Sequence, residues 1–316
     1  GMTYEQGGGG AGGLVITTRE GDPLTLKDRL THHFTAGIST VEVTSQQAGR
    51  VVDEFEKYYR DNVTNPAAPY KSYVIKADNN PDKVNQLTRW MDIHGIRYGK
   101  SGAARSPLRG YDYQTQTVTN VSLGAEDLIV PVHQPKSRFI TAVFEPTSHL
   151  SDSATYDITA WNLMYSYNLK AFATSERLAV NKPFVPAQAE NSSIPDAPYA
   201  YLFRYLGIQD AVFLAALHKQ NIKVRSAQLA FVANGQSYEP GTLIVTRRNN
   251  EGVTDFDQAI IKLAKANKRK INTTTTGFVE KGKDFGSGYV NYLKAPRVAM
   301  LFGEQTASNN AGEIWH

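Results

Sequence analysis

The chain has 316 residues, of which 41% are hydrophobic, and its 34 basic and 30 acidic residues leave a formal net charge of +4. This length is enough for two domains with sizeable cores, and so small a charge excess gives no indication of binding to nucleic acid. Cysteine is absent, which excludes disulfides, thiol nucleophiles and cysteine-ligated metals. No apolar run reaches the length of a membrane span.

The first part of the chain, residues 1–64, predicts a short strand followed by long amphipathic helices. The β-branched run "LVITT" at 14–18 predicts the strand. Apolar residues then recur at helical spacing over 24–42, and the pattern continues to about residue 60. We refer to these residues as the apolar stripe, which consists of Leu26, Leu30, Phe34, Ile38, Val41, Val52, Phe55 and Tyr59.

After the predicted linker "NPAAP", the chain contains two related segments. The stretch at 72–99 predicts a strand, a helix and a second strand, and the stretch at 200–226 matches it without a gap. Further on, "DLIVPVHQP" at 127–135 matches "TLIVTRRNN" at 242–250, and a helical pattern follows each. The matched residues of the first pair include Tyr73 with Tyr201, Lys76 with Arg204, Asp82 with Asp210 and Ile96 with Val224.

This alternation of short β-branched runs with helical patterns predicts an α/β fold. We expect duplicated βαβ-type units with a mostly parallel sheet, preceded by the strand and long helices of residues 1–64. The duplicated domain should span 70–295, with its units at about 70–180 and 198–295. The remaining stretch, 296–316, predicts the first strand and helix of a further domain.

Side chains that could carry chemistry are scattered along the sequence. Gly7, Gly9 and Gly12 fit the dinucleotide-binding pattern G-x-G-x-x-G, but that pattern needs a strand before it and a helix starting within it. The seven histidines form no His-Glu-x-x-His motif. The basic residues at 262–270 fall at the end of a predicted helix, where cations suit the helix dipole, and we interpret them as a solvated helix end. The residues alone therefore supply no complete active site.

Three segments resemble one protein family. "MTYEQGGGGAGG" followed by "GDPLTLKDRLTHHFTAGISTVE" resembles the end of the catalytic domain in carboxypeptidase A-like zinc metallopeptidases, in particular large multidomain members from Bacteroidetes-type bacteria. "DLIVPVHQPKSRFITAVFEP" followed by "YDITAWNLM" resembles their accessory region. Residues 296–316 resemble the start of a terminal domain similar to class I glutamine amidotransferases.

The resemblance implies a catalytic role for Glu5, which with Thr3 and Tyr4 matches the family's Thr-aromatic-Glu motif. This glutamate would be the general base and acid beside a zinc ion, and the glycines after it would belong to an active-site loop. The family's zinc ligands, His-x-x-Glu and a later His, precede this motif and are not among these 316 residues. We therefore expect no metal ligand and no bound zinc in this chain.

These features predict a non-catalytic carboxyl-terminal fragment of a periplasmic or secreted bacterial metallopeptidase. Zinc-dependent hydrolysis of a peptide substrate would occur only in the intact parent, whose upstream peptidase domain would be the partner of this chain. An alternative stays open, in which the chain is a peptide- or cell-wall-binding accessory module with no catalysis. A nucleotide-binding α/β protein is a third hypothesis, based on fold analogy alone.

The apolar stripe leads to a separate expectation about assembly. The resemblance implies that residues 24–60 pack on the peptidase sheet of the parent. Burying a large apolar side chain is worth roughly 1.5–3 kcal/mol, so a stripe without that sheet should find another partner. We expect self-association through residues 14–60, most simply as a symmetric homodimer.

Overall fold

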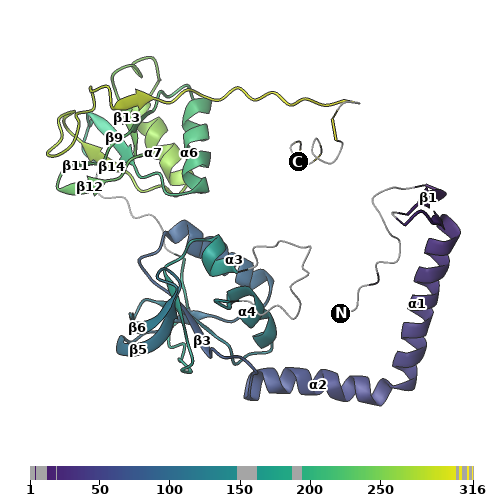
Figure 1. Ribbon diagram of the computed structural model, residues 1–316. Coiled ribbons are helices and arrows are strands. Elements are labelled where there is room, and N and C mark those ends of the chain that lie inside the picture. Colours follow the sequence, from purple (N-terminus) through teal and green to yellow (C-terminus); the bar gives the residue numbers. More distant parts are fainter. Residues whose placement is uncertain are drawn as a thin grey trace. The chain divides into compact units, whose positions relative to one another are not determined.

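The chain forms two compact units, and Figure 1 labels many of their helices and strands. The first unit comprises Gly1–Ala77 and Met91–Phe184, and the second comprises Asp78–Trp90 and Val185–His316. The second unit thus includes a short segment that lies within the first unit's part of the sequence. This computed structural model describes residues 4, 13–18, 20–147, 162–186, 194–303, 306–307, 312 and 315.

The chain ahead of the first sheet forms a small strand pair and two long helices. A capping box fixes the start of the first helix, because the Thr25 hydroxyl accepts the Asp28 N–H while the Asp28 carboxylate accepts the Thr25 N–H. Of the helices that the structure describes, none combines the length and the apolar character needed to cross a bilayer. The elements are β1 (Val15–Thr17), β2 (Pro23–Thr25), α1 (Leu26–Gln46) and α2 (Ala48–Thr64).

The apolar stripe lies on these two helices and is exposed to solvent. No residue of α1 is buried, and Phe34 on α1 and Phe55 on α2 are 69% and 65% exposed. Near its end, α2 contacts the chain just ahead of helix α4 (Ser137–Phe144), where the Asn62 amide donates to the Pro135 carbonyl at 3.0 Å. The stripe is therefore an apolar surface with no cover among the described residues.

We expect the chain to self-associate through this stripe, because pairing two copies would remove its large side chains from water. Light scattering at low micromolar concentration should give a dimer mass, and Phe34→Glu or Phe55→Glu should shift it toward the monomer mass. Ser39→Glu, which adds the same charge to α1 at a position outside the stripe, should leave the dimer intact. A wild-type chain that stays monomeric would contradict this expectation.

The first unit is built around a six-stranded sheet in the order β4-β7-β3-β8-β5-β6. The neighbouring strands β3 and β7 pair with Val74 opposite Ile129, and both side chains are fully buried. The elements are β3 (Ser72–Ile75), the end of α3 (Pro81–Ile93), whose residues 81–90 belong to the second unit, β4 (Gly99–Lys100), β5 (Arg105–Asp112), β6 (Thr117–Leu123), β7 (Leu128–Pro131), α4 (Ser137–Phe144), α5 (Leu163–Ser166) and β8 (Ala171–Thr174).

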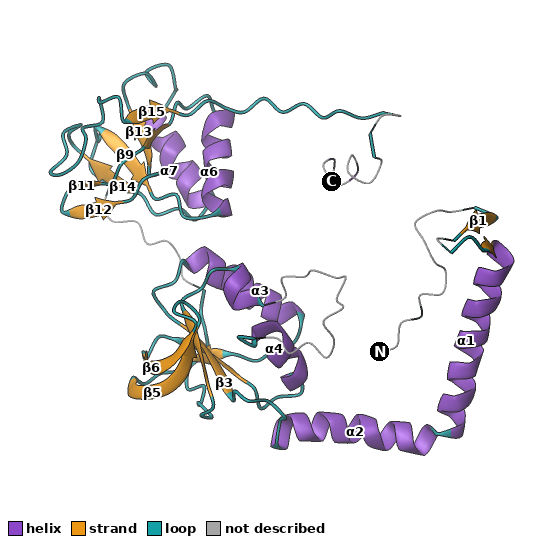
Figure 2. Ribbon diagram, in the orientation of Figure 1, coloured by secondary structure: helices purple, strands orange, loops and turns teal. Residues whose placement is uncertain are grey.

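The second unit has a five-stranded sheet in the order β14-β9-β13-β10-β15, together with a hairpin of two further strands. Two helices, α6 and α7, pack on one face of this sheet (Figure 2), where Phe213 and Ile260 join the core. The elements are β9 (Ala200–Phe203), α6 (Ile208–Lys219), β10 (Arg225–Ala227), β11 (Phe231–Ala233), β12 (Gln236–Tyr238), β13 (Leu243–Thr246), α7 (Phe256–Ala266), β14 (Asn272–Thr274) and β15 (Val290–Tyr292).

The predicted mostly parallel sheet is wrong, because every strand pair in the described residues is antiparallel. In the first unit, β3 and β4 run in the same direction, but β7 lies between them and pairs antiparallel with both. In the second unit, β13 lies between β9 and β10 in the same way. Each βαβ crossover is therefore split by a third strand, as in ferredoxin-like βαββαβ folds.

The prediction of a parallel sheet failed because the four-residue strands β3, β8, β9 and β13 are buried on both faces. Tyr201 and Phe203 of β9 face the helices, whereas Ala200 and Leu202 face a second core that contains Phe231 of the hairpin. A strand buried on both faces is a continuous apolar run, which is also typical of a parallel sheet between two helix layers. Composition therefore could not separate the two arrangements.

The continuous described stretch after β15, residues 293–303, has neither helix nor strand. The strand predicted at the start of 296–316 is absent there, and Val298 and Leu301 are exposed. An isolated strand has no neighbour to complete its backbone hydrogen bonds, so this stretch lacks what a strand requires.

Candidate functional site

The second unit contains a cavity of about 480 Å³. Its lining combines charged groups, amides and a few apolar side chains, which is a mixture typical of ligand pockets. Four basic side chains against two acidic ones leave an excess of two positive charges. The lining residues are Asn80, Pro81, Asp82, Asn85, Phe203, Arg204, Leu206, Asp210, Gln236, Lys268, Arg269, Lys270 and Asn272.

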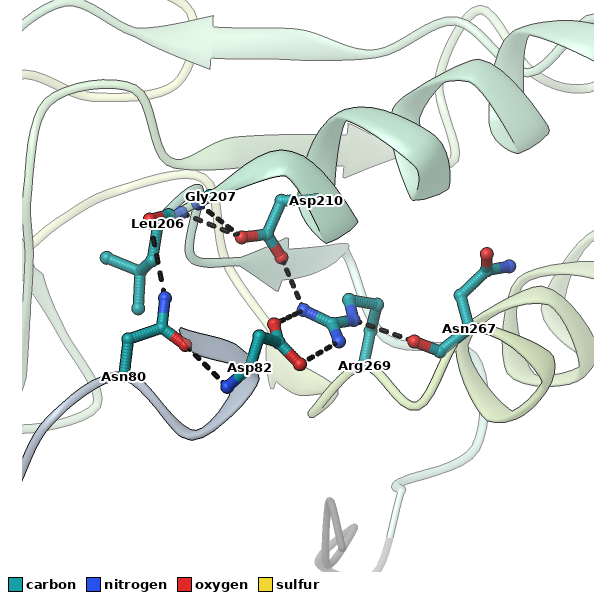
Figure 3. Close-up of polar contacts among 7 residues, drawn as sticks. All are labelled: Asn80, Asp82, Leu206, Gly207, Asp210, Asn267 and Arg269. Carbon is teal, nitrogen blue, oxygen red and sulfur yellow. Dashed lines mark hydrogen bonds and ion pairs between the residues drawn. The ribbon is translucent and has the colours of Figure 1, made fainter. Parts of the chain in front are cut away.

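One wall of the cavity is an ion-pair triad around Arg269, shown in Figure 3. The guanidinium binds Asp82 through two bonds, Nη1 to Oδ2 at 2.6 Å and Nη2 to Oδ1 at 2.8 Å. Its Nη1 also donates to Asp210 Oδ1 at 2.9 Å, and its Nε donates to the Asn267 carbonyl at 2.8 Å. Asp82 and Asp210, which occupy matching positions in the segments 72–99 and 200–226, therefore bind the same arginine.

Burial keeps most of this triad away from water. The side chains of Arg269 and Asp210 are 10% and 7% exposed, and that of Asp82 is 24% exposed. Hydrogen bonding to Asp82 outweighs the effect of burial and, with the bond to Asp210, raises the pKa of Arg269 above its ordinary value. The arginine therefore stays charged and neutralises carboxylates that would otherwise repel each other.

Further hydrogen bonds hold the two aspartates of the triad. Asp210 Oδ2 accepts the N–H groups of Leu206 and Gly207 at 2.8 and 3.0 Å, which caps the start of α6. Asn80 Oδ1 accepts the Asp82 N–H at 2.9 Å, and Asn80 Nδ2 donates to the Leu206 carbonyl at 3.3 Å. With its partners supplied from within the unit, the triad is a structural wall and not a general acid or base.

Other groups on the lining are available to a ligand. Lys268, Lys270 and Arg204 are exposed, and none of them forms an ion pair with a carboxylate of the described residues. The Asn85 Oδ1 atom is buried and has no hydrogen-bond partner among the described residues. The cavity therefore offers cations and an unpaired amide oxygen beside apolar walls, which suits a ligand with a negative charge and a donor group.

The sequence-predicted catalytic residue, Glu5, lies outside the described residues, as does Thr3. The middle residue of the motif is described, and the Tyr4 hydroxyl lies 2.6 Å from Thr40 Oγ1 on α1. In the described ranges, no group of three histidine, aspartate or glutamate side chains is arranged to hold a metal ion. The catalytic role of Glu5 stays a prediction.

The basic run at 262–270 was only in part a solvated helix end. Lys262 and Lys265 are exposed on α7, whereas Lys268, Arg269 and Lys270 follow the helix and line the cavity. Sequence reasoning missed the triad, and its one signal was the match of Asp82 with Asp210.

Comparison of the chain with family models, with curated proteins and with solved structures finds no match. The geometry of the cavity and the resemblance of the sequence segments are the two grounds on which a function can be proposed.

Proposed function

We propose that residues 70–295 are a peptide-binding accessory region, and that the cavity of the second unit holds a negatively charged group of the peptide. The observation that carries this proposal is the positive excess of the cavity lining, with three exposed cations beside Phe203 and Leu206. A volume of about 480 Å³ is within the usual range of small-ligand pockets, so it would admit a part of a peptide and not a folded domain.

The parent of this region is proposed from the sequence resemblance alone. We propose that the parent protein is a periplasmic or secreted zinc carboxypeptidase-like protein, in which Glu5 transfers the proton of a zinc-activated water. The accessory region would hold a peptide while the peptidase domain cleaves it. A parent sequence with His-x-x-Glu and a later His ahead of Glu5 would support this role, and a parent without them would leave peptide binding as the function.

The cavity proposal predicts charge-selective binding. Short acidic peptides should bind the full chain more tightly than basic peptides of the same length in isothermal titration calorimetry, and added salt should weaken the binding. Lys268→Glu combined with Lys270→Glu should weaken it by roughly tenfold or more, because two attractive charges at the lining become repulsive.

The matched control is Lys262→Glu combined with Lys265→Glu. It makes the same change of charge on α7, at residues that do not line the cavity. If both double variants weaken binding equally, the effect is one of net charge, and the cavity is not the site. If neither acidic nor basic peptides bind the wild-type chain, the proposed function is wrong.

A further inference from the structure

We propose that Arg204 is the carboxylate-binding residue of the second unit and receives a carboxylate group of a peptide in the cavity. This inference rests on the proposed function and deepens it by naming the ligand group and the residue. The carboxylate could come from the carboxyl terminus of the peptide or from an acidic side chain, and both offer the same two oxygens.

The first step is the equivalence of two positions in the two sheets. In the first unit, Ile75 pairs with Leu128, so the next residues, Lys76 and Asp127, lie opposite each other. In the second unit, Phe203 pairs with Leu243, which places Arg204 opposite Thr242. Residues directly opposite on neighbouring strands have side chains on the same face of the sheet.

The local turns support this equivalence. The Asp127 N–H donates to the Gly124 carbonyl at 3.2 Å, and the Thr242 N–H donates to the Glu239 carbonyl at 3.2 Å. Each of the two residues therefore closes a turn of the same length immediately before the inserted strand of its unit, β7 or β13. Lys76 with Asp127 and Arg204 with Thr242 are the same pair of positions in the two units.

The two pairs differ in charge. Lys76 Nζ forms an ion pair with Asp127, whose side chain is only 3% exposed, so the first unit neutralises this cation internally. In the second unit the opposite residue is Thr242, which carries no charge and whose hydroxyl donates to the Glu239 carbonyl at 2.7 Å. Arg204 therefore keeps its charge at the edge of the cavity without the carboxylate that its counterpart has.

Arg204 is also held in place for a ligand. Its Nη2 donates to the Ser237 carbonyl at 2.7 Å, and its guanidinium carbon lies 5.3 Å from the centre of the Tyr238 ring. Tyr238 in turn stacks on Phe231, with ring centres 4.9 Å apart and an angle of 13° between the rings. The hydrogen bond to Ser237 and the contact with the Tyr238 ring hold the planar guanidinium of Arg204. Its other N–H groups can bind the two oxygens of a carboxylate side by side.

The test uses three otherwise identical uncharged peptides with the full chain. One has a free carboxyl terminus, one is amidated, and one is amidated with an internal glutamate. Binding of the free acid but not of the amide assigns the terminal carboxylate, and binding restored only by the internal glutamate assigns the side chain. Binding that is the same for all three peptides overturns the proposal.

Three variants locate the group that binds the carboxylate. Arg204→Gln should weaken binding of the carboxylate peptide about tenfold or more, and circular dichroism should show an unchanged fold because Arg204 is exposed. Thr242→Asp places a carboxylate where the first unit has one, and should weaken binding through internal competition. Asparagine has the size of aspartate but no charge, so Thr242→Asn should bind the carboxylate peptide as the wild type does.

The proposal is overturned if Arg204→Gln binds the carboxylate peptide as tightly as the wild type. If Lys268→Glu with Lys270→Glu still weakens binding in that case, the proposed function survives and only the role of Arg204 is lost. If no peptide binds, both are wrong.

Discussion

Arg269→Met is expected to destabilise the second unit by about 3–5 kcal/mol, because it leaves the buried Asp210 carboxylate and the partly buried Asp82 carboxylate together without their cation. Asp82 and Asp210 both bind this guanidinium, and the Asp210 side chain is only 7% exposed. The free energy of unfolding should be measured by urea titration, followed by circular dichroism. We expect the two units to unfold in separate steps, so the loss of stability should appear in the step of the second unit only.

The control for this prediction is Lys268→Met, which removes a positive charge from the adjacent residue. Lys268 is exposed and forms no ion pair with a carboxylate of the described residues, so its loss should change stability little. If Arg269→Met costs no more than this control, the triad does not hold the wall of the cavity together.

The second large effect is expected in the first unit. Asp127→Asn should cost about 2–4 kcal/mol, because it removes the charge that pairs with Lys76 and replaces one acceptor oxygen by a donor. The wild-type carboxylate accepts from the Ala77 N–H at 2.9 Å and from the Gly124 N–H at 2.6 Å as well. The amide of asparagine cannot satisfy all of these donors.

The neighbouring residue supplies the control for Asp127→Asn. Glu126 also pairs with a lysine, Lys100 at 2.7 Å, but its side chain is 59% exposed. Glu126→Gln should therefore have a much smaller effect in the same urea titration. Equal losses for the two variants would mean that the burial of Asp127 is not what makes its ion pair important.

The sequence predicted where the strands of the two units begin better than it predicted their order and direction in the sheets. The match of 72–99 with 200–226 placed the starts of β3 and β9 at corresponding positions. The direction of the sheet could not follow from it, because direction depends on which strand inserts between the two that a helix connects. That insertion places β7 between β4 and β3, and β13 between β9 and β10, although each inserted strand comes from farther along the chain.

The candidate site was less predictable than the strands. Arg269 and Asp82 are 187 residues apart, and nothing in the local sequence of either residue indicates the other. The sequence match joined Asp82 to Asp210 as equivalent residues but could not show that they share a partner. The sequence match likewise showed Arg204 only as the counterpart of Lys76. That Arg204 faces no carboxylate depends on the residue opposite it, Thr242, which lies just before the neighbouring strand.

The make-up of the second unit has a consequence for how this protein can be divided. The unit takes residues 78–90 from one part of the sequence and the rest from residue 185 onward, with all of 91–184 between them. A chain cut to begin at Val185 would retain Arg269 and Asp210 but lose Asp82, Asn80 and Asn85. The cavity can be transferred as one contiguous stretch of the gene only together with residues 91–184 of the first unit, and a recombination event within 91–184 would separate Arg269 from Asp82.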